Sequence, residues 1–136
     1  MTKKEWTYKN EPFCGPGPFY GFVYCITNNL TGRKYIGKKF FWSAKRKQVN
    51  KVRKRIKVES DWKDYWSSSE ELKADVERLG KENFTREILH LCPNKGTTNY
   101  LEAKEQFVRG VLEDNAAWYN SWIQCKIHKS HVKLSV

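Results

Sequence analysis

Residues 20–37 constrain the fold most strongly, because two short apolar runs there flank a polar turn in the sequence YGFVYCITNNLTGRKYIG. Short apolar runs bounded by Asn and Gly residues are typical of paired β-strands. We therefore predict a β-hairpin with strands at 20–27 and 33–37 around the turn from Asn28 to Gly32. Each strand carries one tyrosine, Tyr24 or Tyr35, and a segment rich in lysine and arginine follows the second strand.

Two helices are predicted downstream of the hairpin from apolar residues that recur at helical spacing. The first covers 67–79, with Ser67 as its N-cap and a glutamate three residues later. The second covers 99–112, and Asn99 with Glu102 has the same cap-and-box spacing. Both segments are therefore expected to pack one apolar face against a sheet.

A third strand is predicted over 83–91, where apolar and polar residues alternate. Together with the hairpin and the helices, it predicts a small mixed α/β (α+β) domain with a three-stranded antiparallel sheet flanked by helices. The expected organisation is an N-terminal arm at 1–19, a domain at 20–122, and a C-terminal tail at 123–136 that packs on the domain or extends it.

The net charge of +11 is concentrated in one third of the chain. Residues 12–58 contain 12 Lys and Arg and no Asp or Glu, whereas residues 59–136 contain 11 basic and 13 acidic side chains. Such a segment is typical of a surface that binds a polyanion. We predict a basic helix within 43–57. The residues predicted to contact nucleic acid are Lys38, Lys39, Lys45, Arg46, Lys47, Lys51, Arg53, Lys54, Arg55 and Lys57.

The basic segment is also compatible with a solvated loop, a localisation signal or a site for an anionic membrane surface. The membrane alternative is weak, because Val49, Val52 and Ile56 form only a thin apolar stripe. No run approaches the roughly 20 apolar residues of a membrane span, and no secretory signal is seen at the N-terminus. We therefore expect a cytoplasmic protein without a membrane partner, and buried or incidental thiols at its four separated cysteines.

Several polar residues are candidates for chemistry. Tyr24 and Tyr35 lie on adjacent predicted strands, where their phenols either pack in the core or hold a water and a phosphate oxygen. Glu105 lies among apolar positions of the second helix, so its carboxylate needs either a metal ion such as Mg²⁺ or an ion pair with Arg109. Asn120, taken alone, is typical of a turn or a loop cap.

The chain resembles the GIY-YIG nuclease superfamily through five motifs in the family's order. FVY at 22–24 stands where the family has GIY, and KYIG at 34–37 matches the second half of the signature. The segment from 65 to 89 is similar to the family's serine-led helix, glycine turn and third strand. EAKEQFVRGVL resembles the helix that bears the family's metal-binding glutamate, and WYN at 118–120 resembles its terminal asparagine motif.

The resemblance implies roles for four residues and a metal cofactor. Tyr24 would position or deprotonate the attacking water, and Tyr35 would hydrogen-bond the water or the scissile phosphate. Glu105 would bind one Mg²⁺ or Mn²⁺ ion, and Asn120 would brace the site. These roles would place two phenols and a helical carboxylate in one pocket.

The family also has an arginine that stabilises charge on the phosphate, usually on the helix after YIG. The basic segment of this chain contains an insertion at that place, so the position of the arginine is ambiguous. We favour Arg46, with Arg53 and Arg55 as alternatives. Lys38 and Lys39 directly follow the glycine of YIG and are also expected to touch phosphate.

The resemblance and the charge together predict a metal-dependent DNA endonuclease. The alternatives are a nucleic-acid-binding module that keeps the fold without catalysis, and a ribonuclease. Specificity would come from loops, from the N-terminal arm or from assembly into a homo-oligomer. By analogy with phage members of the family, the protein would act in the cytoplasm of a host cell.

Overall fold

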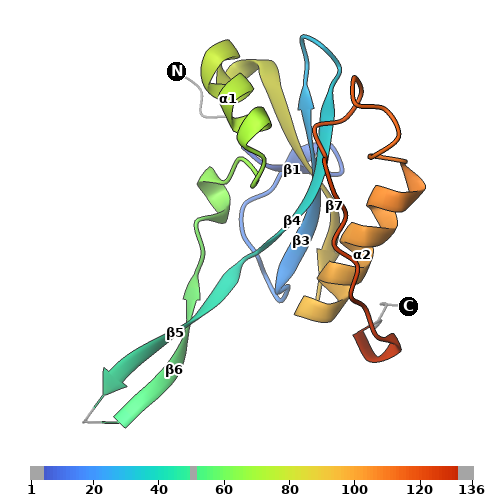
Figure 1. The fold of residues 1–136 in the computed structure, drawn as a ribbon. Coiled ribbons are helices and arrows are strands. Elements are labelled where there is room, and N and C mark those ends of the chain that lie inside the picture. The colour runs from blue at the N-terminus through green and yellow to red at the C-terminus, as the bar shows by residue number, and fades with distance from the viewer. Residues whose placement is uncertain (1–4, 50–51, 132–136) are drawn as a thin grey trace.

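The computed structural model describes residues 5–49 and 52–131, with side chains for all of these except 45–49, 53–55 and 131. A five-stranded mixed sheet lies at the centre of the molecule, in the order β2-β1-β7-β3-β4 (Figure 1). Among the strand pairs that the structure describes in this sheet, β1 and β7 are parallel and the other pairs are antiparallel. Its strands are β1 (Thr7–Tyr8), β2 (Glu11–Pro12), β3 (Gly21–Asn28), β4 (Lys34–Phe40) and β7 (Phe84–Cys92).

The predicted α+β fold is confirmed, and the three predicted strands are the antiparallel β7-β3-β4 part of the sheet. The sheet is wider than predicted, because the N-terminal segment adds β1 and β2 at one edge. The register pairs Tyr24 on β3 with Gly37 on β4, and Ile26 with Tyr35. The two tyrosines are thus diagonal neighbours.

Both predicted helices are present, but each has a different N-cap from the predicted one. Helix α1 (Glu70–Leu79) is capped by Ser69, whose hydroxyl accepts a hydrogen bond from the Leu72 N–H, rather than by Ser67. Helix α2 (Lys95–Val108) begins four residues before Asn99, because the Asn94 side chain accepts a bond from the Thr97 N–H at 2.8 Å. The first turn of α2 is polar, so the spacing of apolar residues did not indicate where the helix begins. Two 3-10 helices, η1 (Trp62–Asp64) and η2 (Lys81–Asn83), precede and follow α1.

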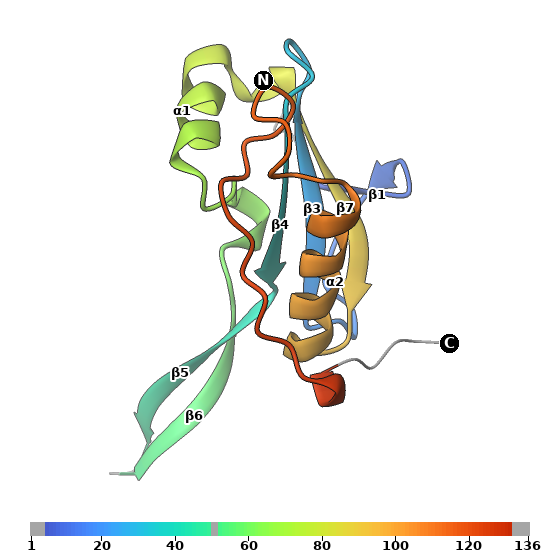
Figure 2. The same cartoon turned by 45° about the vertical axis from the view of Figure 1, so that its right-hand side comes forward.

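The prediction of a basic helix within 43–57 is wrong, because this segment forms a two-stranded antiparallel sheet. Its strands are β5 (Trp42–Val49) and β6 (Val52–Glu59). Val49 and Val52 are cross-strand partners, and β-branched residues at such positions favour strands. Figures 1 and 2 show this pair of strands projecting from the body of the molecule as an extension of β4.

Alternate residues of β3 face two different cores, one on each side of the sheet. Phe22, Tyr24 and Ile26 belong to an aromatic-rich cluster that includes residues of α1. Val23 and Cys25 belong to a smaller cluster on the opposite face, which α2 covers (Figure 2). Successive side chains of a strand point to opposite faces of the sheet, so a strand that is buried on both faces contributes alternate residues to two cores.

The N-terminal segment predicted as an arm is part of the domain. Trp6 is only 2% exposed, packs against Phe22 and Tyr24, and donates its indole N–H to the Trp62 carbonyl at 2.7 Å. The C-terminal tail runs along the outside of the domain near α2 and ends its described part in η3 (Lys129–His131) (Figure 2). Within the described residues, no helix is long and apolar enough to cross a membrane.

A substitution of Trp6 tests whether the N-terminal segment stabilises the core. We expect Trp6→Ala to lower the free energy of unfolding by about 3–5 kcal/mol, because it leaves a cavity and removes the indole hydrogen bond to the Trp62 carbonyl. Urea denaturation measures this loss. Phe107→Ala is the matched control, since that side chain is 60% exposed and its loss should change stability by less than about 0.5 kcal/mol. Equal stability of both variants would mean that the segment does not hold the core.

Candidate functional site

The two tyrosines of the hairpin meet above Gly37. The ring centroids of Tyr24 and Tyr35 are 6.2 Å apart, with planes 30° from parallel. A Cβ atom at position 37 would lie 2.5 Å from the Tyr24 hydroxyl and 2.7 Å from the Tyr35 ring. The missing side chain therefore allows the Tyr24 phenol to reach across β4, which is a close approach that only glycine permits.

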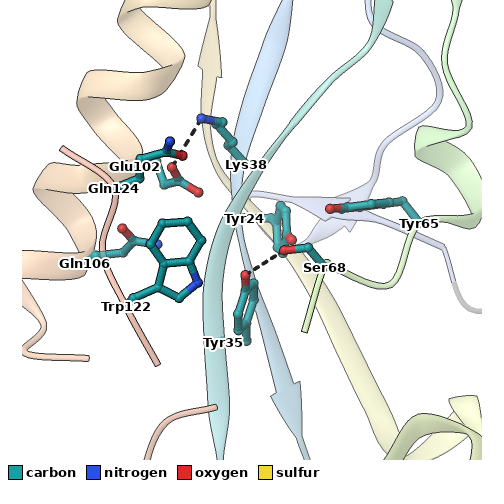
Figure 3. Close-up of a pocket in the computed structure, with 9 residues that line it drawn as sticks. All are labelled: Tyr24, Tyr35, Lys38, Tyr65, Ser68, Glu102, Gln106, Trp122 and Gln124. Carbon is teal, nitrogen blue, oxygen red and sulfur yellow. Dashed lines mark hydrogen bonds and ion pairs between the residues drawn. The ribbon is translucent and has the colours of Figure 1, made fainter. Parts of the chain in front are cut away.

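A cavity of about 190 Å³ opens beside these phenols (Figure 3). Strands β3 and β4 supply the tyrosines and Lys38, the loop before α1 supplies Tyr65 and Ser68, and α2 supplies Glu102 and Gln106. The C-terminal tail closes one side. The side chains around the cavity are Tyr24, Tyr35, Lys38, Tyr65, Ser68, Glu102, Gln106, Trp122 and Gln124.

Both hairpin phenols are neutral at neutral pH. Tyr24 is 1% exposed, and burial raises its pKa well above the usual 10, with further contributions from the nearby phenols of Tyr65 and Tyr35. Burial also raises the pKa of Tyr35, although the hydrogen bond with Ser68 opposes the change. The Tyr35 hydroxyl lies 3.2 Å from the Ser68 hydroxyl, and either group could be the donor (Figure 3).

The loop that carries Tyr65 and Ser68 is held by a buried arginine. Arg86 on β7 donates hydrogen bonds to the Lys63 and Tyr65 carbonyls at 3.1 and 2.9 Å, and its guanidinium lies 4.3 Å from the Trp66 ring centroid. Burial lowers the pKa of Arg86 to about 10, so it stays charged at neutral pH. These contacts fix the backbone that places Tyr65 beside Tyr24, at 6.1 Å between ring centroids.

Glu102 is the carboxylate that α2 places in the cavity. Its side chain is 13% exposed, and it pairs with Lys38, whose Nζ is 3.6 Å from Oε1. Burial raises the pKa of Glu102, and the lysine only partly opposes this effect. A buried carboxylate in this situation gains stability from any additional cation that enters the cavity.

Gln106 lies one turn after Glu102 and offers a second oxygen. Its amide N–H₂ donates to the Ile36 carbonyl at 2.9 Å, and the residue is 4% exposed. Its amide oxygen is buried and has no hydrogen-bond partner within the described part of the chain. Figure 3 shows both side chains projecting from α2 on the side of the tyrosines. Oxygen donors of these two types suit Mg²⁺, which is usually bound by one or two carboxylates with water and phosphate.

Glu105 is not brought into the cavity, contrary to the predicted convergence with Tyr24 and Tyr35. Its carboxylate accepts a hydrogen bond from Arg109 at 2.7 Å and contacts His90 at 3.2 Å. Burial raises its pKa, but the bonds from Arg109 and His90 outweigh burial, so the pKa of Glu105 is lowered overall. Of the two partners predicted for the Glu105 carboxylate, a metal ion or Arg109, the structure shows the ion pair with Arg109.

Asn120 fastens the edge strand β4 directly beside the tyrosines. Its side-chain oxygen accepts from the Ile36 N–H at 3.1 Å, and its amide group donates to the Ile36 carbonyl at 2.8 Å. Ile36 lies between Tyr35 and Gly37, so one side chain satisfies both backbone groups in the middle of the motif. Two backbone bonds between Lys34 and residues 117–119 extend the same contact.

The structure describes the side chains of only three of the residues predicted to contact DNA. Lys38 lines the cavity, Lys39 pairs with Asp61 at 2.7 Å, and Lys57 lies 4.4 Å from the Trp42 ring centroid. The backbones of Lys45, Arg46, Lys47, Arg53, Lys54 and Arg55 lie on β5 and β6, and their side chains are outside the described residues, as is the whole of Lys51. The predicted catalytic role of Arg46 is therefore untested. Among the described side chains, those around the cavity include no arginine.

Sequence reasoning missed Tyr65, Ser68, Glu102 and Gln106 as members of the site. Glu102 fits a capping box only for a helix that begins at 99, whereas α2 begins four residues earlier. A glutamate three residues before Glu105 occupies a similar helical face, so only the packing of α2 on β4 separates the two.

No group of three or more metal-ligating His, Cys, Asp or Glu side chains occurs among the described residues, which include His90 and His128.

Comparison with known proteins gives one family match. The family model described as "Putative endonuclease segE, GIY-YIG domain" matches residues 6–123, which include every side chain of the cavity except Gln124. No curated protein and no solved structure matches the chain. The match begins at Trp6, in agreement with the integration of the N-terminal segment into the fold.

The close approach at Gly37 generates a test of the tyrosine arrangement. We expect Gly37→Ala to lower the free energy of unfolding by about 1–3 kcal/mol and to change the near-ultraviolet circular dichroism of the tyrosines, because the new methyl group overlaps both phenols. Gly15→Ala is the matched control, since a Cβ there meets nothing within 4 Å. Native stability and an unchanged tyrosine signal in the Gly37→Ala variant would contradict the described packing.

Proposed function

Because the chain belongs to the family of segE-type GIY-YIG endonuclease domains, we propose that it is a DNA endonuclease that hydrolyses phosphodiester bonds with the help of a divalent metal ion. Family membership supports nuclease activity and contact with nucleic acid. The convergence of Tyr24, Tyr35, Lys38 and Glu102 around one cavity is the observation that carries the proposal. It gives hydroxyl donors, a cation and a buried carboxylate within one small volume.

The proposed metal is Mg²⁺ or Mn²⁺, held by Glu102 with the amide oxygen of Gln106. The raised pKa of Glu102 and the buried, unpartnered oxygen of Gln106 fit such an ion. A bound ion would neutralise charge on the phosphate and stabilise the oxygen that leaves. Because two protein oxygens leave most positions of an octahedral Mg²⁺ to water and phosphate, this donor set suits a site that is completed by the substrate.

The tyrosines would hold the reacting groups as neutral hydrogen-bonding phenols. The raised pKa of Tyr24 disfavours a phenolate, so this residue would position the attacking water by accepting and donating hydrogen bonds. Tyr35 has a partner in Ser68, and when the serine donates, the phenol proton is available for a phosphate oxygen. Ser68 would thus act as a positioning residue for Tyr35.

Lys38 would place positive charge beside the phosphate, and Asn120 would fix the strand that carries the tyrosines. Lys38 lies next to Glu102, and its ammonium is free to move to a phosphate oxygen when a metal ion compensates the carboxylate. The sequence favours Arg46 for the charge-stabilising role, but its backbone lies on β5, which leads away from the body of the molecule (Figure 1). We therefore assign this role to Lys38.

Substitution of the two glutamates of α2 separates the metal ligand from its neighbour. We expect Glu102→Gln to reduce Mg²⁺-dependent cleavage of plasmid DNA by on the order of 100-fold or more, because loss of the ligand removes several kcal/mol of transition-state stabilisation. Glu105→Gln is the matched control on the same helix and should retain activity within about tenfold. Gel electrophoresis of plasmid over time measures both.

If Glu105→Gln lost cleavage activity and Glu102→Gln retained it, Glu105 and not Glu102 would be the metal ligand. Intact plasmid with wild type and both variants, across buffers and metals, would support a non-catalytic nucleic-acid-binding module. Single- and double-stranded RNA incubated in parallel tests the ribonuclease alternative, because faster cleavage of RNA than of DNA would contradict the proposed substrate.

The raised pKa of Glu102 predicts a pH-dependent metal affinity. Protons compete with the ion for the carboxylate, so the apparent Mg²⁺ dissociation constant should rise about tenfold per pH unit below that pKa, beginning above the ordinary value of 4.5. Without metal, a raised pKa stabilises the protein at low pH, and this contribution is lost as the pH rises through it. In thermal unfolding measured at several pH values, Glu102→Gln should abolish this loss of stability. If the variant and the wild type have the same dependence of stability on pH, the raised pKa does not belong to Glu102.

A further inference from the structure

Strands β5 and β6 form a sheet of their own that makes no ladder with the five-stranded sheet within the described residues. Eight residue pairs join them in one antiparallel register, from Trp42 opposite Glu59 to Val49 opposite Val52. Both ribbon views show these strands extending beyond the body of the molecule (Figures 1 and 2). We call residues 42–49 and 52–59 the basic ribbon.

The basic ribbon places like charges opposite one another. Arg46 is the cross-strand partner of Arg55, and Lys47 is the partner of Lys54. The two strands of the ribbon contain seven Lys and Arg and one acidic residue, Glu59 at the base. Like charges directly opposite destabilise a strand pair, and a lone two-stranded hairpin is at best marginally stable in water. A polyanion that binds this segment removes the repulsion, so the composition favours such a partner.

The register divides the basic ribbon into two chemically different faces. Cross-strand partners share a face, and successive pairs alternate between faces. One face, which we call the arginine face, contains the pairs Arg46–Arg55, Gln48–Arg53 and Ala44–Lys57, and the pair Trp42–Glu59 at the base of the ribbon. The other, the lysine face, contains the pairs Lys45–Ile56, Lys47–Lys54 and Val49–Val52. Arginine and glutamine are donors that read base edges, whereas lysine acts mainly as a point charge for phosphate.

The base of the ribbon is fixed to the strand that carries the cavity residues. Phe41 is fully buried, its N–H donates to the Tyr20 carbonyl at 2.8 Å, and its carbonyl accepts from the Ser60 N–H at 2.8 Å. The Ser60 hydroxyl also donates to the Phe40 carbonyl at 2.6 Å. Since Phe40 is the last residue of β4, the ribbon has a defined position relative to Tyr35 and Lys38.

The dimensions of the ribbon match a DNA groove. An eight-residue strand is roughly 26 Å long at about 3.3 Å per residue, which corresponds to about seven or eight base pairs. The major groove of B-DNA is about 12 Å wide and admits a two-stranded ribbon, whereas the major groove of an RNA duplex is too deep and narrow for side chains to read.

We propose that the basic ribbon enters the major groove of duplex DNA beside the cleavage cavity, with the arginine face toward the base edges and the lysine face supplying charge to the flanking phosphates. This inference rests on the proposed function for its choice of DNA as the polyanion. It assigns a DNA-reading element to the described part of this chain, at a fixed offset from the phosphate that would be cut.

The test compares two triple variants that remove equal charge from the two faces. They are Arg46, Arg53 and Arg55→Gln for the arginine face, and Lys45, Lys47 and Lys54→Gln for the lysine face. The matched control replaces three exposed lysines of the body, Lys63, Lys73 and Lys104, by Gln. Each full-length protein is titrated without divalent metal onto a DNA duplex of about 30 base pairs, at several salt concentrations. Dimethyl sulfate protection then reports contact at guanine N7 in the major groove.

We expect the arginine-face variant to bind DNA about tenfold or more weakly near 0.15 M salt and to lose guanine N7 protection even at saturating protein. The lysine-face variant should reduce the salt slope by about two to three while retaining that protection. The body control should change neither quantity. For an RNA duplex of equal length, the two triple variants should weaken binding equally.

Three results would overturn the proposal: native affinity of the arginine-face variant, N7 protection that survives its substitution, or loss of protection in the lysine-face variant as well. A shortened protein, in which Asn-Gly joins Ala44 to Lys57, repeats the test if a triple variant unfolds, as judged by circular dichroism. Ribbon-dependent binding without cleavage by wild type would refute only the nuclease proposal. Cleavage by wild type with ribbon-independent binding would refute only the groove contact.

Discussion

The side-chain bonds from Asn120 to both backbone groups of Ile36 are the constraint on which the site depends. Strand β4 is at the edge of the sheet, so its outward N–H and C=O groups would otherwise face water or another strand. Gln106 on α2 shares the same carbonyl acceptor. One residue of β4 thus joins the tail, helix α2 and the tyrosine hairpin, and the cavity lies where these three segments meet. A site at a protected edge stays open to a large substrate while its strand remains rigid.

Local patterns were sufficient to predict the hairpin and its tyrosine pair. Alternation and turn residues define the strands, and the register that follows from them brings Tyr24 and Tyr35 to one face. The same kind of pattern did not distinguish Glu102 from Glu105. Both lie on one side of α2, and the choice depends on how the helix crosses β4, which is a packing relation between segments more than 50 residues apart. The integration of Trp6 into the core was missed for the same reason, since its partners are Phe22 and Trp62.

The basic segment was mispredicted because charge density says little about backbone conformation. A helical reading of 43–57 leaves Val49, Val52 and Ile56 as a thin apolar stripe, whereas in the ribbon these β-branched residues lie on one shared face. The strand also continues directly from β4, so the preceding element favours extension. Propensity and context therefore agree on a ribbon, although its many basic residues are individually compatible with a helix.

The cavity and the basic ribbon contribute differently to the electrostatics of the molecule. Within the cavity the charges of Lys38 and Glu102 nearly cancel, and the hairpin phenols, whose pKa values burial raises, are neutral. Such a site attracts a polyanion only weakly over a distance, while the ribbon carries strong positive charge and none of the cavity residues. Under the proposed function, long-range attraction and register would come from the ribbon, and the cavity would become positive only when a metal ion binds. Affinity for DNA and catalysis would then be separable properties of one small domain.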